Sequence, residues 1–181
     1  MSLEDEAVRL RPFTEADVQA LVACLNDPEI SRWTRIPFPY SEADARAFIL
    51  STNERAFAIT DRRSGELLGG IGLRLATDRI GEVGYWVKRD ARGRGVATRA
   101  LRLVSRWALE GEALARLQLT AEPENVASLR VAGKAGFTRE GLLRRYLDIG
   151  GERRDAFMFS LLPEELPPAQ GPPRATTRFR A

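Results

Sequence analysis

The sequence predicts an α+β domain, with helices and strands mixed along the chain and one sheet that is mostly antiparallel. Three observations lead to this fold class. Apolar residues recur at helical spacing in the first third, three strand-like runs joined by short turns fill the middle, and one helix of crossover length separates these runs from a later strand. The 181 residues suffice for one domain with a sizeable core and leave no room for a second large one.

The front third is predicted to be helical after one short strand. Residues 8–11 alternate between apolar and charged side chains, as a strand does. Thr14 is placed to cap a helix, which the Asn-Asp-Pro run at residues 26–28 breaks. After an aromatic and proline-rich stretch, a second helix is expected over residues 41–53.

The middle of the chain reads as a meander followed by one crossover. Strands are expected at residues 56–60, 67–75 and 80–88, joined by short turns. A glycine-rich loop then leads into a helix over residues 96–109, and a short strand follows at residues 117–121. Because this return spans a crossover of the usual length, we expect the last strand to lie parallel to the third.

The last third is predicted to contain one helix and one hairpin. The helix opens at Asn125 and ends near residue 135, where Gly136 occupies a position typical of a helix C-terminus. Strands at residues 143–149 and 153–161 then flank Gly150-Gly151, a dipeptide suited to a type I′ turn.

The domain is expected to span residues 1–166, followed by a flexible Pro/Arg-rich tail over residues 167–181. The tail lacks a periodic apolar pattern, and it contains Arg174, Arg178 and Arg180 but no acidic residue. Residues 1–166 therefore carry equal numbers of basic and acidic side chains. The net charge of +3 comes from the tail, so we expect no nucleic-acid partner.

Several classes of chemistry are excluded by composition. The chain has no histidine, which removes Ser-His-Asp hydrolysis, Cys-His proteolysis and His-ligated zinc, and we expect no metal. The general base is then a carboxylate, a tyrosine, a terminus or water. A lone Cys24, an acidic N-terminus and the lack of a long apolar run favour the cytoplasm and no membrane partner.

One local charge excess follows the third strand of the meander. Seven basic residues against Asp90 alone lie here: Lys88, Arg89, Arg92, Arg94, Arg99, Arg102 and Arg106. Within the stretch, Arg92-Gly93-Arg94-Gly95 leads into a helix, and glycines before a helix N-terminus favour binding of a pyrophosphate. Alone, such a loop is equally typical of a tight turn.

The order and spacing of several segments resemble the GNAT superfamily of acyl-CoA-dependent N-acetyltransferases, over roughly residues 7–162. Arg92, Gly95 and Ala97 match the superfamily signature Gln/Arg-x-x-Gly-x-Gly/Ala. The segments that resemble the RimJ/RimL-type branch, the N-terminal acetyltransferases of ribosomal proteins and their relatives, are Leu10 to Asp17, Gly84 to Val87, Arg92 to Ala97, Asn125 to Ser128, Lys134 to Phe137 and Ser160 to Leu162. The resemblance implies a GNAT-type three-layer fold with about seven strands and about four helices. The sheet is expected to be splayed at strands 4 and 5, which are the strands predicted at residues 80–88 and 117–121.

The resemblance also implies how acetyl-CoA, the co-substrate, binds in the splay. The pantetheine arm pairs with backbone groups at Trp86 and Val87, and Asn125 also holds it. The pyrophosphate lies on the backbone N–H groups of the loop and first helical turn, formed by Arg92, Gly93, Arg94, Gly95, Val96, Ala97 and Thr98.

The implied catalytic residues are Ser128 and Glu82. Many GNAT enzymes carry a tyrosine seven residues after the asparagine, which protonates the departing thiolate, and this chain has Ala132 there. In the RimJ/RimL type the hydroxyl corresponding to Ser128 takes this part, although a helix serine also commonly bonds its own backbone. Glu82 is the candidate base for the amine, and is equally readable as a solvated strand residue; Asp155 and Glu140 are weaker candidates.

The acceptor is left open by the sequence. Trp33, Phe38, Tyr40 and Tyr146 are candidates for its binding side, although aromatic residues at such spacing also occur in cores. The amine is a protein or peptide N-terminus, a polyamine, an amino acid or a drug-like amine, and succinyl-CoA is an alternative donor. A non-catalytic acyl-CoA-binding regulatory domain is the competing function, and a homodimer is among the oligomeric states left open.

Overall fold

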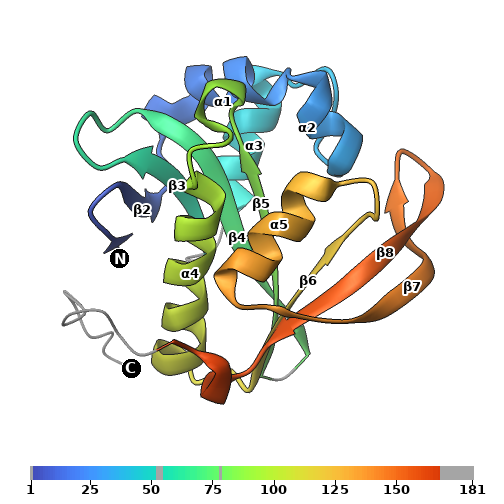
Figure 1. Ribbon diagram of the computed structural model, residues 1–181. Coiled ribbons are helices and arrows are strands. Elements are labelled where there is room, and N and C mark those ends of the chain that lie inside the picture. The colour runs from blue at the N-terminus through green and yellow to red at the C-terminus, as the bar shows by residue number, and fades with distance from the viewer. Residues whose placement is uncertain (1, 52–54, 78, 168–181) are drawn as a thin grey trace.

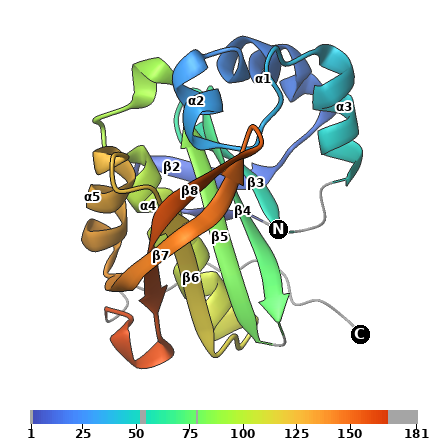
Figure 2. The ribbon, with the colours of Figure 1, turned by 90° about the vertical axis from the view of Figure 1, so that its right-hand side faces the viewer.

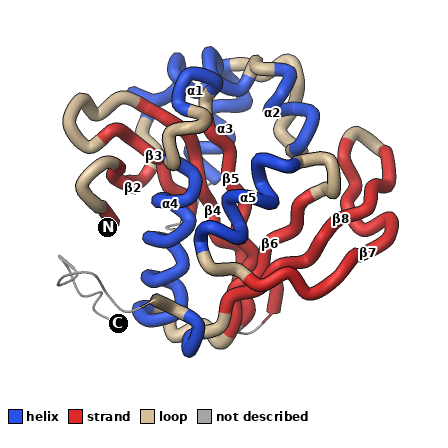
Figure 3. Tube along the Cα trace, in the orientation of Figure 1, coloured by secondary structure: helices blue, strands red, loops and turns tan. Residues whose placement is uncertain are grey.

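The structure, a computed structural model, describes residues 2–51, 55–77 and 79–167. One sheet runs through the molecule, and helices lie around its strands (Figures 1 and 3). The strands are β1 (Leu3–Glu4), β2 (Val8–Pro12), β3 (Ala56–Asp61), β4 (Leu67–Thr77), β5 (Ile80–Val87), β6 (Arg116–Ala121), β7 (Thr138–Ile149) and β8 (Glu152–Leu161). The α-helices are α1 (Val18–Leu25), α2 (Pro28–Trp33), α3 (Glu42–Ser51), α4 (Val96–Arg106) and α5 (Val126–Ala135).

The sheet order is β1-β2-β3-β4-β5-β6-β8-β7, and β5–β6 is the one parallel pair among the described strands. The α+β class, the meander of β3, β4 and β5, and the parallel crossover through α4 are thereby confirmed. The hairpin turn is also as predicted, because Gly150 and Gly151 both have positive φ values (62° and 82°).

Two features of the front third and one of the hairpin differ from the prediction. Within the described residues the sheet has eight strands rather than about seven, because the two-residue β1 pairs with β2. The same described residues form five α-helices rather than about four, because the run at residues 26–28 starts α2 instead of only ending α1: the Asp27 side chain accepts the Glu29 N–H, and Pro28 suits a first helical turn. β7 begins at Thr138, five residues before the predicted start.

The helices cover the two faces of the sheet unequally. α4 and α5 lie side by side on one face, over a core cluster that includes Leu10, Phe57 and Leu119 (Figure 1). The three short helices α1, α2 and α3 pack on the other face at one end of the strands, over a second cluster around Leu21 and Ala58 (Figure 2). No helix in the described part of the chain is long and apolar enough to cross a membrane.

Candidate active site

The strands β5 and β6 diverge soon after they meet. Their pairing is recorded for three residue pairs, Ile80–Arg116, Gly81–Leu117 and Glu82–Gln118, while β5 continues to Val87 and β6 to Ala121. Backbone groups on the facing edges beyond Glu82 therefore have no ladder partner in the opposite strand. The gap suits an extended ligand that supplies hydrogen bonds in place of a strand, and the predicted splay is confirmed.

A glycine loop and the N-terminus of α4 follow β5. Gly93 and Gly95 have φ values of 73° and 80°, a region that favours glycine, and a Cβ at either position would meet no protein atom within 4 Å. The first helical bond runs from Arg99 N–H to Gly95 O, so the N–H groups of the preceding residues have no acceptor within the helix. The loop thus presents open backbone donors to an anion.

Asp27 fixes this loop to the start of α2. Arg92 donates to Asp27 Oδ2 (2.6 Å) and to the Val87 carbonyl oxygen (3.1 Å), and Arg89 donates to Asp27 Oδ1 (3.0 Å). Burial alone would raise the pKa of Asp27, but the bonds from Arg89, the Glu29 N–H and Arg92 hold it below its usual value. The Arg92 side chain is engaged inside the protein, and its backbone N–H donates to the Arg89 carbonyl oxygen (3.2 Å), so a part for Arg92 in phosphate binding stays a prediction.

The basic excess counted in the sequence is largely paired. Acidic side chains or carbonyl oxygens engage Lys88, Arg89, Arg92, Arg99, Arg102 and Arg106. Among the described residues of this stretch, Arg94 is the basic side chain for which no hydrogen bond or ion pair is recorded, although its charge helps to lower the pKa of Asp61. Arg94 is therefore the one best placed to meet a phosphate at the loop.

Asn125 and Ser128 begin α5, directly after β6. Asn125 caps the helix, because its Oδ1 accepts the Ser128 N–H (3.1 Å). The Ser128 Oγ lies 2.7 Å from the hydroxyl of Tyr85 on β5, so this pair bridges the gap between β5 and the helix after β6. Tyr85 is a site residue that the sequence reasoning missed. Strand alternation places it on the face of Val83, but no spacing along the chain says that α5 passes over it.

Glu82 lies on the opposite face of β5 from Tyr85. Arg74 on β4 donates to its Oε2 (2.7 Å), and both line a hollow of about 290 Å³. Cross-strand partners Gly72 and Gly84 form part of the wall, where the backbone is bare. Glu82 is half-buried, with 26% of its side chain exposed, so a carboxylate is accessible there.

The two weaker base candidates are otherwise engaged. Arg116 binds both carboxylate oxygens of Glu140 (2.7 and 2.6 Å) and Ser160 donates to Oε1, so the pKa of Glu140 is lowered to about 2. A carboxylate with so low a pKa is a poor proton acceptor at neutral pH. Asp155 accepts the Arg145 backbone N–H (2.7 Å) at a bulge of β7.

A larger cavity of about 890 Å³ lies between the segment after α2 and the β7–β8 hairpin. It is lined by Ser31, Thr34, Arg35, Ile36, Pro37, Phe38, Asp148, Ile149, Gly150, Glu152 and Arg154. Arg35 closes one side by donating to the Asp148 carbonyl oxygen (3.1 Å). The cavity joins the front helical segment to the hairpin, the two parts of the chain that carry the predicted acceptor residues.

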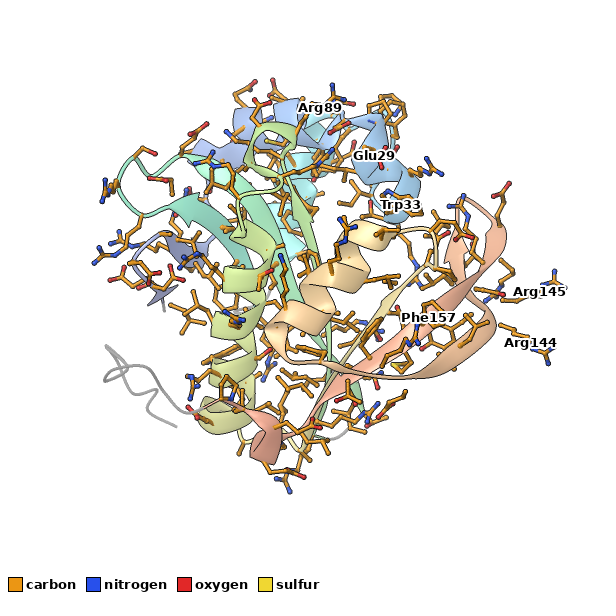
Figure 4. All side chains as sticks on the ribbon, in the orientation of Figure 1. Glu29, Trp33, Arg89, Arg144, Arg145 and Phe157 are labelled. Atoms are coloured by element: carbon orange, nitrogen blue, oxygen red, sulfur yellow. The ribbon has the colours of Figure 1, made fainter. Side chains whose placement is uncertain are left out.

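The predicted aromatic residues are not gathered in this cavity, except Phe38. Trp33, labelled on α2 in Figure 4, donates to Glu29 Oε1 (2.8 Å). Tyr40 is 6% exposed and belongs to the second core cluster. Tyr146 is 43% exposed and follows Arg145, which projects from the outer rim of β7 in Figure 4. A part for Trp33, Tyr40 and Tyr146 in acceptor binding thus stays a prediction.

Residues 7–138 match the family described as acetyltransferase (GNAT) domain. A Bacillus licheniformis protein described as uncharacterized N-acetyltransferase p20 is 29% identical over 91% of this chain and 97% of its own. The ribosomal-protein-serine acetyltransferase of Escherichia coli K12 is 28% identical over 77% of this chain and 84% of its own.

A solved structure, that of Mycobacterium smegmatis RimJ in complex with CoA-disulfide, is 26% identical. It superposes with a TM-score of 0.78 over 92% of this chain and 88% of that one. The family match covers most of the chain, and the relatives named above are described as acetyltransferases. The chain therefore belongs to the GNAT family of N-acetyltransferases.

Proposed function

We propose that the chain transfers an acetyl group from acetyl-CoA to a primary amine, a protein N-terminal α-amine or a small-molecule amine, by direct attack in a ternary complex. The observation that carries this proposal is the Ser128 hydroxyl held at the β5–β6 gap, together with the open backbone donors of the glycine loop that follows β5. The β5–β6 gap and the segments that follow these two strands thus offer room for an extended ligand, backbone donors for an anion, and a proton donor.

The residues present fit an acyl-CoA. Gly93 and Gly95 leave room for phosphate oxygens, with Arg94 beside them, and the unpaired edge of β5 suits the amide groups of a pantetheine arm. Acetyl-CoA supplies the activated acyl group. Asn125, whose Oδ1 caps α5, stays in the proposal as the residue that holds the arm.

Proton transfer is divided between the two faces of β5. On the face covered by α5, Ser128 donates its proton to the sulfur as the carbon–sulfur bond breaks. On the other face, Glu82 accepts the proton of the attacking amine, directly or through a water. An α-amine with a pKa near 8 is roughly a tenth neutral at pH 7, so a weak base suffices for it.

A thiol-release assay tests this function with acetyl-CoA and a panel of N-terminal peptides, polyamines and amino acids. We expect thiol release that depends on the amine. Thiol release with succinyl-CoA and not with acetyl-CoA would identify succinyl-CoA as the acyl donor. Tight CoA binding without release for any amine would favour the alternative, a non-catalytic acyl-CoA-binding regulatory domain.

Ser128→Ala tests the chemistry within the same assay. We expect kcat to fall by about 10²-fold, the usual scale for an acid–base group, with CoA affinity unchanged. Ser105→Ala is the matched control, because Ser105 is a buried serine on α4 whose hydroxyl has no hydrogen-bond partner in the part of the chain that the structure describes. A near-normal kcat in Ser128→Ala would make Ser128 a structural residue of α5.

A further inference from the structure

Tyr85 connects β5 to α5 across the gap. It lies three residues beyond the last recorded β5–β6 pair, and its ring packs against the first core cluster. Its hydroxyl lies 2.7 Å from Ser128 Oγ and 3.5 Å from the Ser128 carbonyl oxygen. The two hydroxyls thus form a pair at the place where the strands separate.

The direction of this hydrogen bond decides what Ser128 does. A hydroxyl has one proton to donate and two lone pairs that accept. Either hydroxyl can be the donor by geometry, but a phenol is a stronger acid than a serine hydroxyl, even with the pKa of about 12 that burial gives Tyr85, so Tyr85 is the better donor of the two. With Tyr85 donating, the Ser128 proton is left for another acceptor, and the Ser128 backbone is already fixed by its bond to Asn125 Oδ1.

We propose that Tyr85 is a positioning residue for acyl transfer: it donates to Ser128 Oγ, directs the Ser128 proton into the gap and replaces that proton when Ser128 gives it up. This inference rests on the proposed function. Many GNAT enzymes carry a tyrosine at the position of Ala132 on α5, and in this chain Tyr85 on β5 supplies the phenol instead.

The protons and electrons balance. The new carbon–nitrogen bond replaces the carbon–sulfur bond, and the sulfur keeps that electron pair and takes the Ser128 proton. Ser128 takes the Tyr85 proton, and Tyr85 regains one from water, which has received the amine proton by way of Glu82.

The environment of Tyr85 keeps it protonated at neutral pH. Burial raises its pKa to about 12, although the bond with Ser128 works in the opposite direction. A protonated phenol in contact with Ser128 is the state that the relay needs before each turnover.

Tyr85→Phe tests the relay because phenylalanine keeps the ring and its packing. We expect kcat to fall about tenfold or more while KM for acetyl-CoA and the calorimetric Kd of CoA stay within about twofold. In a Ser128→Ala background the same change should cause no further loss, because Tyr85 acts through Ser128. Thr60→Val is the control: it removes a buried hydroxyl that bonds Arg9 O in β2, and should leave kcat unchanged.

A second measurement tests the pairing without turnover. The Tyr85 hydroxyl proton should exchange slowly with water in NMR spectra of the wild type, and fast in Ser128→Ala. Fast exchange in the wild type, or no effect of Ser128→Ala, would overturn the hydrogen bond on which the relay depends.

The outcomes of the kinetic test are distinct. Absence of wild-type turnover would overturn the proposed function and the relay together. Wild-type turnover with an unchanged kcat in Tyr85→Phe would overturn the relay alone. A further full loss in the double variant, or a CoA affinity that falls with kcat, would give Tyr85 a structural part instead.

Discussion

At the residue scale, the alternation of β5 separates two kinds of chemistry. Tyr85 contacts Ser128 on the face covered by α5, whereas Glu82 contacts Arg74 on the opposite face. Successive residues of a strand point to opposite faces, so the odd number of steps between Glu82 and Tyr85 puts the proposed base and the Tyr85–Ser128 pair on opposite faces of β5.

Replacing Glu82 by glutamine should affect the amine and not the donor. We expect kcat/KM to fall at neutral pH and to recover as the pH approaches the pKa of the acceptor amine, because the amine is then already neutral. A pH–rate profile with an acceptor from the amine panel measures this. Glu4→Gln, which removes a carboxylate paired with Arg9 on β2, is the control. A Glu82→Gln profile parallel to that of the wild type would place the base in bulk solvent or at Asp155.

The sequence identifies some of these residues and not others. Asn125 and Ser128 stand at a recognisable helix start, and Glu82 lies on a recognisable strand. Tyr85 and Asp27 acquire their parts only through contacts between distant segments, to Ser128 and to Arg92 respectively. Such contacts depend on how α5 and α2 cross the sheet, which no local periodicity specifies.

At the element scale, the side chains around Glu140 join three strands near the β7 edge of the sheet. Arg116 on β6 and Ser160 on β8 both bond Glu140 on β7. The cluster therefore holds the β6-β8-β7 part of the sheet together, where β7 is otherwise an exposed edge.

The low pKa of Glu140 predicts a pH-dependent contribution to stability. Its folded pKa of about 2 lies below the ordinary value of 4.5, so the contribution is present above pH 4.5 and is lost as the pH falls towards 2. Glu140 is 41% exposed, so we expect Glu140→Gln to cost only about 1 kcal/mol at pH 7. Urea unfolding from pH 7 to pH 3 should show this difference shrinking below pH 4.5, and a constant difference would contradict the account.

Elements differ in how far sequence predicts them. α4 and the β3–β5 meander have strong periodicity and clear turns, and both are found, although α4 ends at Arg106 and a π-helical turn, Trp107–Gly111, takes the place of the end of the predicted helix. α2 was missed because Asp27-Pro28 ends one helix and starts another, two uses that the same residues allow. β7 was predicted too short because its first residues are exposed and irregular, with register shifts near Arg139 and Leu143.

At the scale of the whole molecule, the order of the predicted helices and strands along the chain already indicates the sheet topology. The C-terminal end of the domain, predicted at residue 166, stays a proposal. The predicted tail, residues 167–181, lies outside the described residues except for Pro167. Up to that point the chain packs on the body: Leu166 contacts the first core cluster, and Arg106 donates to the Pro167 carbonyl oxygen. We propose that the domain ends here.

A chain ending at Pro167 should unfold at the same temperature as the full chain and bind CoA equally well. Residues 168–181 carry no periodic apolar pattern to bury. A chain ending at Leu162 is the control: it also loses Leu166 and the Arg106 contact, and should be less stable. If the chain ending at Pro167 did not bind CoA, the tail would have a part in the site.

Two glycine variants locate CoA binding on the loop before α4. Gly95→Val places a side chain at a φ of 80°, which strains the loop and blocks phosphate approach, so any stabilisation by CoA should disappear. Gly133→Ala, within α5 and without close neighbours, should raise stability by about 0.5–1 kcal/mol and keep the response to CoA.

Thermal unfolding of the wild type with CoA or acetyl-CoA tests the central claim most directly, because a ligand that binds only the folded state stabilises it by mass action. We expect the midpoint to rise with the concentration of either ligand, by the equivalent of about 2.7 kcal/mol at a hundred times Kd. An unchanged midpoint with both, together with a rise caused by NAD or ATP, would contradict the claim that the β5–β6 gap and the loop at Gly95 form an acyl-CoA site.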